Sequence, residues 1–232
     1  MVQLWTDIVQ GLASLLNYVY LHAGQDYGIA IILLTLGVRV LMLPLTIKQT
    51  RSMQEMQRVQ PMLKKLQEKY KDDKQKLQEE MMKFYQEHKV NPLGGCLPML
   101  LQFPVMIALF RMLIHDPPLR IPNAPYNFLF LVPDLSASVG KYGLAHWQSA
   151  IPYIILVALM IVTTYVPQKM MTSDPQQEKM MIFMSIFMAW IAWSLPAGVI
   201  LYWVTTNVWT IGQQYIMLKA QPAPAAKGAG NG

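Results

Sequence analysis

Cysteine and charged residues are scarce in this 232-residue sequence, and both shortages narrow the possible classes of protein. The single cysteine, Cys96, excludes a disulfide within the chain. A lone cysteine is more often a small buried apolar residue than a nucleophile. Charged residues make up 14% of the chain and hydrophobic residues 53%, whereas an average soluble domain carries about 25% charged residues. The composition therefore indicates a membrane protein.

Residues that catalyse reactions or bind metals are also few and scattered. The four histidines form no H-E-x-x-H pattern, and neither G-x-S-x-G nor a phosphate-binding glycine loop is present. The long apolar stretches contain no Asp or Glu, which disfavours proton-coupled transport, and the absence of an internal repeat disfavours the common secondary transporters. No basic leader precedes the first apolar stretch. We expect neither an enzyme nor a bound cofactor or metal, and no small-molecule substrate.

What the sequence does contain is a charge inside its first long apolar stretch. Residues 27–47 are long enough to cross a bilayer, which takes about 20 residues, and Arg39 lies within them. A guanidinium at the centre of a membrane helix costs roughly 2.5–3.5 kcal/mol, so Arg39 is expected to face a water-filled cavity or a polar partner. The alternative is that its side chain reaches the nearer interface, about 12 Å away along the helix. We favour the wet cavity.

Residues 2–22 repeat apolar side chains at the helical period, with polar residues such as Asp7 and Asn17 between them. The pattern predicts an amphipathic helix. Two placements remain open: the helix lies in the membrane interface beside the first span, or it packs on the end of a helical bundle.

Residues 48–91 hold more than half of the basic residues of the chain, and the positive-inside rule places them in the cytoplasm. Two short apolar stripes on either side of Asp72 and Asp73 predict a helical hairpin, in which these acids form the turn and cap the second helix. The hairpin is either a solvated element without a task or a docking surface for anionic partners such as lipid head groups or ribosomal RNA.

The rest of the chain predicts four more spans, for five in all, with the N-terminus outside and the C-terminus in the cytoplasm. We expect an all-α membrane protein. Its remaining parts are spans at 96–114, 150–168, 180–195 and 199–218, an extracytoplasmic loop at 115–148 and a disordered tail at 220–232.

The predicted spans contain hydroxyl and amide side chains as well as Arg39. They would form a polar, positively charged recess that could host the polar part of a nascent membrane protein. Methionines on the later spans suit varied clients, although they could equally fill the bundle interior. The recess candidates are Thr35, Arg39, Thr46, Gln102, Thr163, Thr164, Thr205, Thr206 and Asn207.

Several short motifs, each weak alone, occur in order over about residues 27–218. They include Gly37-Val38-Arg39, Leu43-Pro44-Leu45-Thr46 followed by Lys48-Gln49, Asn91-Pro92-Leu93-Gly94-Gly95-Cys96-Leu97-Pro98 with Gln102 and Pro104, Asp174-Pro175-Gln176-Gln177, Leu195-Pro196-Ala197-Gly198 and Leu201-Tyr202-Trp203. Together they resemble the core spans of the bacterial YidC membrane protein insertases. The sequence departs from the Gram-negative pattern because it shows no extra first span and no large periplasmic domain, and its tail is barely basic.

The resemblance implies a five-helix core with a hydrophilic groove open to lipid and cytoplasm. It implies insertion and folding of nascent membrane proteins in the bacterial cell membrane, alone or with the Sec translocon, and contact with the ribosome. Arg39 matches the groove arginine, Thr35 a polar groove position, and Tyr202 and Trp203 an aromatic pair that contacts clients. The predicted groove therefore comprises Arg39, Thr35, Gln102, Thr164, Tyr202, Trp203 and Thr206.

Two other functions remain open. The protein could be a membrane-anchored scaffold for ribosomes or assembly partners, in which case the hairpin would matter and Arg39 would not. It could also be a small-solute channel, although the lack of acids within the predicted spans argues against coupling to protons.

Overall fold

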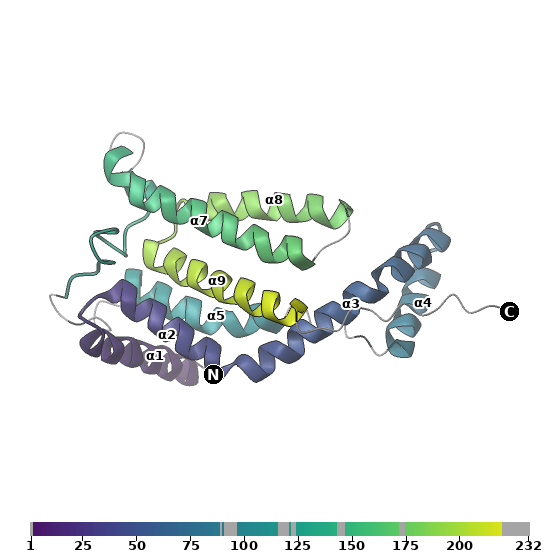
Figure 1. The fold of residues 1–232 in the computed structure, drawn as a ribbon, viewed down its shortest axis with the longest axis horizontal. Coiled ribbons are helices and arrows are strands. Elements are labelled where there is room, and N and C mark those ends of the chain that lie inside the picture. Colours follow the sequence, from purple (N-terminus) through teal and green to yellow (C-terminus); the bar gives the residue numbers. More distant parts are fainter. Residues whose placement is uncertain are drawn as a thin grey trace.

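The protein forms a bundle of helices from which a helical hairpin projects (Figure 1). This computed structural model describes residues 2–88, 90, 97–115, 121, 124–142, 147–171 and 175–219. Within these residues every extended regular element is helical, so the all-α prediction is confirmed there. The helices are α1 Val2–His22, α2 Tyr27–Leu41, α3 Leu43–Lys69, α4 Lys74–Glu87, α5 Leu97–Phe110, the π-helical segment η2 Arg111–His115, α6 Val139–Tyr142, α7 Trp147–Met171, α8 Pro175–Ala192 and α9 Ala197–Lys219.

Helix α9 lies at the centre of the bundle. It packs against α7 on one side and against α2 and α5 on the other, while α8 packs on α7 and α1 packs on α2 and α5 (Figure 1). The interior includes Tyr153 and Met160 of α7 and Ile200 of α9, each at most 1% exposed. Lipid tails are as apolar as these side chains, so close packing is a main attraction that holds such helices together in a bilayer.

Helix α1 has the bounds expected of the predicted amphipathic helix. Its apolar stripe, Val9, Ala13, Leu16 and Tyr20, is at most 4% exposed because α1 packs along α2 and α5. The chain bends by 119° between α1 and α2, so the two helices fold back on one another. Other apolar side chains of α1 face outward, among them Tyr18 at 60% exposed. Helix α1 thus packs on the bundle and also presents an apolar outer surface, where contact with the membrane interface stays a prediction.

The structure divides the predicted span 27–47 at Met42. Asp26 caps the start of α2 by accepting a 2.8 Å hydrogen bond from the Ile29 amide. Pro44 occupies the first turn of α3, where its missing N–H is tolerated and its fixed φ favours a new helix. Arg39 consequently lies in the last turn of α2, beside the point where the hairpin begins.

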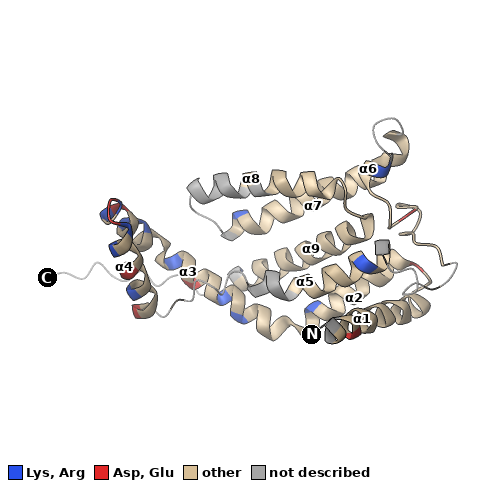
Figure 2. Ribbon diagram, turned by 180° about the vertical axis from the view of Figure 1, so that it is seen from behind, with Lys and Arg blue, Asp and Glu red and all other residues tan. Residues whose placement is uncertain are grey.

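Helices α3 and α4 form the projecting hairpin. Asp73 caps α4 by accepting a 3.0 Å hydrogen bond from the Lys76 amide, which confirms the predicted acidic turn and cap. A thin apolar seam joins the two helices, with Val59 and Leu63 buried at 8% and 7% exposed. Lys, Arg, Asp and Glu gather on this hairpin far more than on the described bundle helices (Figure 2).

Membrane-spanning length is clear for one described helix. Trp147–Met170 of α7 is long and apolar enough to cross a bilayer, α1 and α2 pass the same test only as a bent pair, and Gln102–Leu113 is a shorter apolar helix. Five spans therefore stay a prediction, as does the N-outside topology. Cys96 and the predicted tail at 220–232 lie outside the described residues.

A loop closes the bundle at the end opposite the hairpin. Phe128 packs against Gly28 so closely that a Cβ at Gly28 would overlap its ring. The Gly28 amide donates a 3.1 Å hydrogen bond to the Asn127 carbonyl, and the Leu129 amide donates to the Asp26 carboxylate. Further along, the Tyr153 hydroxyl donates to the backbone carbonyl of Asp134 at 3.1 Å. These contacts tie the loop to the ends of α2 and α7.

Candidate functional site

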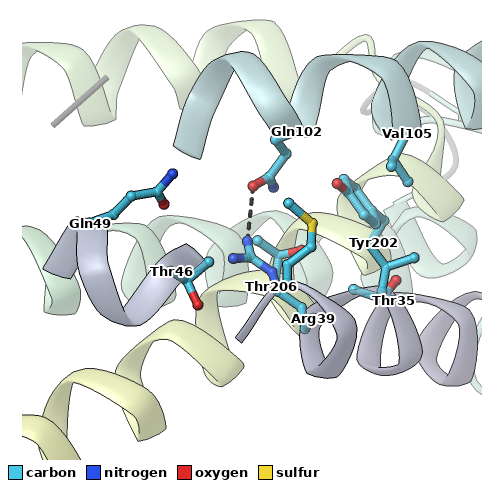
Figure 3. Close-up of a pocket in the computed structure, with 10 residues that line it drawn as sticks. Thr35, Arg39, Thr46, Gln49, Gln102, Val105, Tyr202 and Thr206 are labelled. Carbon is cyan, nitrogen blue, oxygen red and sulfur yellow. Dashed lines mark hydrogen bonds between the residues drawn. The ribbon is translucent and has the colours of Figure 1, made fainter. Parts of the chain in front are cut away.

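A polar recess lies where α2, α3, α5 and α9 meet, at the hairpin end of the bundle (Figure 3). Its volume is about 390 Å³ when the open mouth is included. None of its ten lining residues is acidic, so Arg39 supplies the only formal charge of the lining. The lining consists of Thr35, Val38, Arg39, Met42, Thr46, Gln49, Gln102, Val105, Tyr202 and Thr206.

Arg39 is half-buried and reaches across the recess from α2 to α5. Its Nη2 donates a 2.9 Å hydrogen bond to Oε1 of Gln102, the contact drawn in Figure 3. An amide oxygen orients the guanidinium without neutralising it, in contrast to a carboxylate partner. The guanidinium has five N–H donors, so this one bond leaves it capacity to bind an anionic or carbonyl-bearing guest.

Helix α9 supplies the opposite wall through Tyr202 and Thr206, which are one helical turn apart and are 5% and 3% exposed. Thr35 lies one turn before Arg39 on α2, and its hydroxyl donates to the Ile31 carbonyl at 2.6 Å. This back-bond satisfies the hydroxyl within its own helix, as is common for threonine in apolar helices. Thr35 therefore contributes mainly an acceptor oxygen to the recess.

Two of the seven predicted groove residues lie away from this lining. Thr164 of α7 accepts a 2.9 Å hydrogen bond from Nδ2 of Asn207, within the α7–α9 contact. The same Asn207 amide donates to the Thr163 hydroxyl at 3.3 Å. Trp203 is half-buried against the apolar core. The recess brings together Arg39, Thr35, Gln102, Tyr202 and Thr206, whereas Thr164 and Trp203 are not among the residues that line it.

Gln49 belongs to the recess but was absent from the predicted set. The first half of α3 buries Thr46, Gln49, Thr50 and Gln54, although this part of the sequence reads as polar and basic. Polar residues three or four positions apart that directly follow a membrane span share one helix face. That spacing was the signal that could have found Gln49.

The site contains hydroxyls, carboxamides and one cation. In the described part of the chain, no three side chains of His, Cys, Asp or Glu come close enough to hold a metal ion. The lining itself includes neither a histidine nor a carboxylate that could act as a general base toward a hydroxyl. The site is suited to binding: it can donate hydrogen bonds to a polar guest, accept hydrogen bonds from it, and attract a negatively charged one.

Fold and site together define a helical-bundle protein with a cationic, hydrogen-bonding hollow at one end. The sequence profile of the 60Kd inner membrane protein family matches residues 18–224. The chain therefore belongs to this family of inner membrane proteins, to which the YidC-type insertases belong, and the resemblance noted in the sequence is confirmed.

Named relatives support the assignment. The membrane protein insertase YidC of Pelobacter propionicus is 42% identical over 219 residues, which is 93% of this chain and 39% of the relative. That of Caldanaerobacter subterraneus subsp. tengcongensis is 42% identical over 212 residues, 91% of this chain and 94% of the relative. A crystal structure of an active YidC insertase with its first transmembrane domain resolved superposes with a TM-score of 0.70 at 28% identity. It matches 91% of this chain and 46% of its own, so this chain spans less than half of that protein.

Proposed function

We propose that this protein inserts nascent membrane proteins into the bacterial inner membrane and helps them fold, using the recess around Arg39. One observation carries the proposal: a half-buried guanidinium opens into a polar hollow, and its one hydrogen-bond partner among the described residues is a neutral amide. The named insertases among its relatives support the same function. This chain matches 46% of the solved insertase, so activities of the remaining part of that protein are not assigned to this chain.

The physical task of an insertase is to move a polar segment through hydrocarbon. Each unsatisfied backbone group costs several kcal/mol there, and a charged side chain costs more. A recess lined by hydroxyls and amides replaces part of the lost hydration. Arg39 adds attraction for acidic residues, so clients with acidic translocated tails would gain most from it.

The apolar outer surface of α7 and α8 completes the proposed path. A client helix that leaves the recess needs a lipid-like surface to rest on, and adaptable or aromatic side chains provide it. Trp203, next to the recess residue Tyr202, and Thr164 would contact clients at the edge of this surface. Its exposed apolar residues include Ile151, Ile154, Ile155, Leu159, Val162, Ile182, Phe183, Ile186 and Trp190.

The orientation that fits this task has the hairpin in the cytoplasm and the loop at the opposite end of the bundle outside. The concentration of Lys and Arg on α3 and α4 supports it (Figure 2). In a Cys96→Ser background, an impermeant thiol reagent should label Phe130→Cys from outside the membrane. Lys71→Cys should react only after the membrane is opened, and the reverse pattern would exclude this topology.

The hairpin also favours contact with the ribosome or with the Sec translocon. Its charged surface projects beyond the bundle, where anionic RNA or a partner protein could reach it (Figure 2). This observation keeps a scaffold role as the second candidate function. A scaffold would lose all function on deletion of residues 50–89 and would not need Arg39.

The test compares two charge states of position 39 in liposomes that contain only this protein. Arg39→Ala should slow insertion of a client with an acidic translocated tail by about tenfold or more, since hydrogen bonds to charged groups are worth about 1.5–3 kcal/mol. Arg39→Lys should keep most of the rate because the charge remains. Arg51→Ala, which removes an exposed arginine of α3, is the matched control. Wild-type insertion by a folded Arg39→Ala protein would refute the proposed mechanism.

A further inference from the structure

Gln49 is the most unusual side chain in the recess. Its residue is 5% exposed, and neither its Nε2 nor its Oε1 has a hydrogen-bond partner in the described part of the chain. Figure 3 shows the carboxamide extending from α3 toward the space next to Gln102. Gln102, by comparison, accepts from Arg39. One glutamine of the lining is therefore engaged, and the other offers both a donor and an acceptor.

A buried carboxamide with both ends unpaired is costly. Each unsatisfied donor or acceptor costs about 1–3 kcal/mol, and native structures leave few such groups. Apolar lipid tails or an apolar client helix could not satisfy it. The group that fits has an acceptor and a donor side by side, as a peptide unit has with its C=O and N–H.

We propose that Gln49 pairs with the backbone peptide groups of the polar client segment as this segment enters the recess. The inference rests on the proposed insertase function and adds the chemistry that the site recognises. A polar segment in extended form carries an unpaired N–H and C=O at nearly every residue, whatever its side chains. Gln49 thereby serves clients of any tail sequence, whereas Arg39 favours acidic ones. Gln49 thus recognises the backbone of the client, and Arg39 recognises its acidic side chains.

Ordered water is the competing occupant of the Gln49 site. A water molecule can bridge buried polar groups, and the recess has room for one. If the site holds a water molecule that serves only the structure, replacing Gln49 should affect the insertion of all clients equally, or should affect only the stability of the protein. Pairing with the client backbone predicts that the effect depends on the N–H groups of the client.

The experiment compares Gln49→Met, which keeps the volume but removes the amide, with the wild type on three clients that differ only in the translocated tail. One tail is uncharged and has all its N–H groups, the second alternates proline so that half of these donors are absent, and the third is acidic. Gln49→Met should slow insertion of the uncharged tail about fivefold, the value of one hydrogen bond of about 1 kcal/mol. The proline tail should be slowed clearly less. Gln57→Met, eight residues further along α3 and outside the lining, is the control.

Each result decides between the readings. Equal slowing of the uncharged and proline tails, or no slowing of either, would overturn the backbone role of Gln49. Gln49→Ala, which cannot overfill the site, repeats the test if Gln49→Met melts below the wild type. Arg39→Ala on the acidic tail is run in parallel. If Arg39→Ala slows that client while Gln49 variants do nothing, the insertase proposal stands and this inference fails.

Discussion

Gly28 shows how one residue can fix the end of a helix. It lies in the first turn of α2, and a Cβ there would enter the space of the Phe128 ring. Gly28→Ala should lower the free energy of unfolding by about 1–3 kcal/mol, the usual cost of overpacking. The matched control is Gly37→Ala on the same helix, where nothing lies within 4 Å of the added methyl.

The measurement for the Gly28 prediction is the melting temperature of the purified protein in detergent. Gly37→Ala should leave it unchanged or raise it slightly, because alanine favours the helix over glycine by up to about 1 kcal/mol. Equal melting of both variants would show that the loop does not press on α2 as described.

Asp134 makes the stability of the loop opposite the hairpin depend on pH. Burial alone would raise the pKa of this carboxyl, but hydrogen bonds from Ser136 and Lys141 outweigh it and hold the pKa below its usual range. A depressed folded-state pKa stabilises the protein above the unfolded value of about 3.9, and the stabilisation is lost as the pH falls through the folded-state pKa.

Melting between pH 3 and pH 7 should reveal this contribution. The wild type should lose stability below about pH 4, where unfolded aspartate takes up a proton. Asp134→Asn should be less stable at pH 7 and should lose less on acidification. A variant whose pH profile runs parallel to that of the wild type would contradict the role of the Asp134 carboxylate.

Among the recess residues, the charged one was easier to predict from the sequence than the neutral polar ones. Arg39 stood out because a lone cation in an apolar stretch has few acceptable environments. Gln49 did not, since a neutral polar residue next to a basic segment reads as solvated. Trp203 was expected in the groove with Tyr202, yet neighbours on a helix point about 100° apart, so only one of the two lines the recess.

At the scale of elements, the α3–α4 hairpin depends on a seam of few residues. Leu63 is 7% exposed in that seam, whereas its neighbour Met62 is 44% exposed. Leu63→Ala should weaken the hairpin by about 2 kcal/mol and leave the bundle intact. Met62→Ala should change little.

Hydrogen exchange of the α4 amides measures this effect. Exchange over Lys74–Glu87 should accelerate more than about tenfold in Leu63→Ala, because 1.4 kcal/mol corresponds to a factor of ten. Exchange in α7 and α9 should stay as in the wild type. Acceleration throughout the bundle would show that the hairpin is not a separate unit of stability.

Helix starts were predictable where an acidic residue caps them. Asp73 illustrates this, because aspartate before a helical stretch is a strong local signal. The division at Met42 was not foreseen, since Pro44 within an apolar stretch is compatible with a kinked span as well as with a new helix. Only the packing of α2 and α3 against their neighbours decides between these alternatives.

For the whole molecule, composition and order of motifs predicted an all-helical membrane protein of the YidC type, and the family assignment agrees. The arrangement of helices around α9 could not be predicted from the sequence. When a helix is apolar on nearly all sides, its pattern of residues does not show which face packs on other helices and which faces lipid. Which four helices meet at Arg39 therefore had to come from the structure.

The central claim is that the polar tail of a client enters the recess around Arg39. A photoreactive amino acid in place of Thr35, which is 3% exposed in the lining, tests it against one in place of Leu33, which is 46% exposed on the same helix. With a ribosome-bound client stalled during insertion, position 35 should crosslink to the polar tail and position 33 should not. Crosslinks of equal yield from both positions, or none from position 35, would contradict the account.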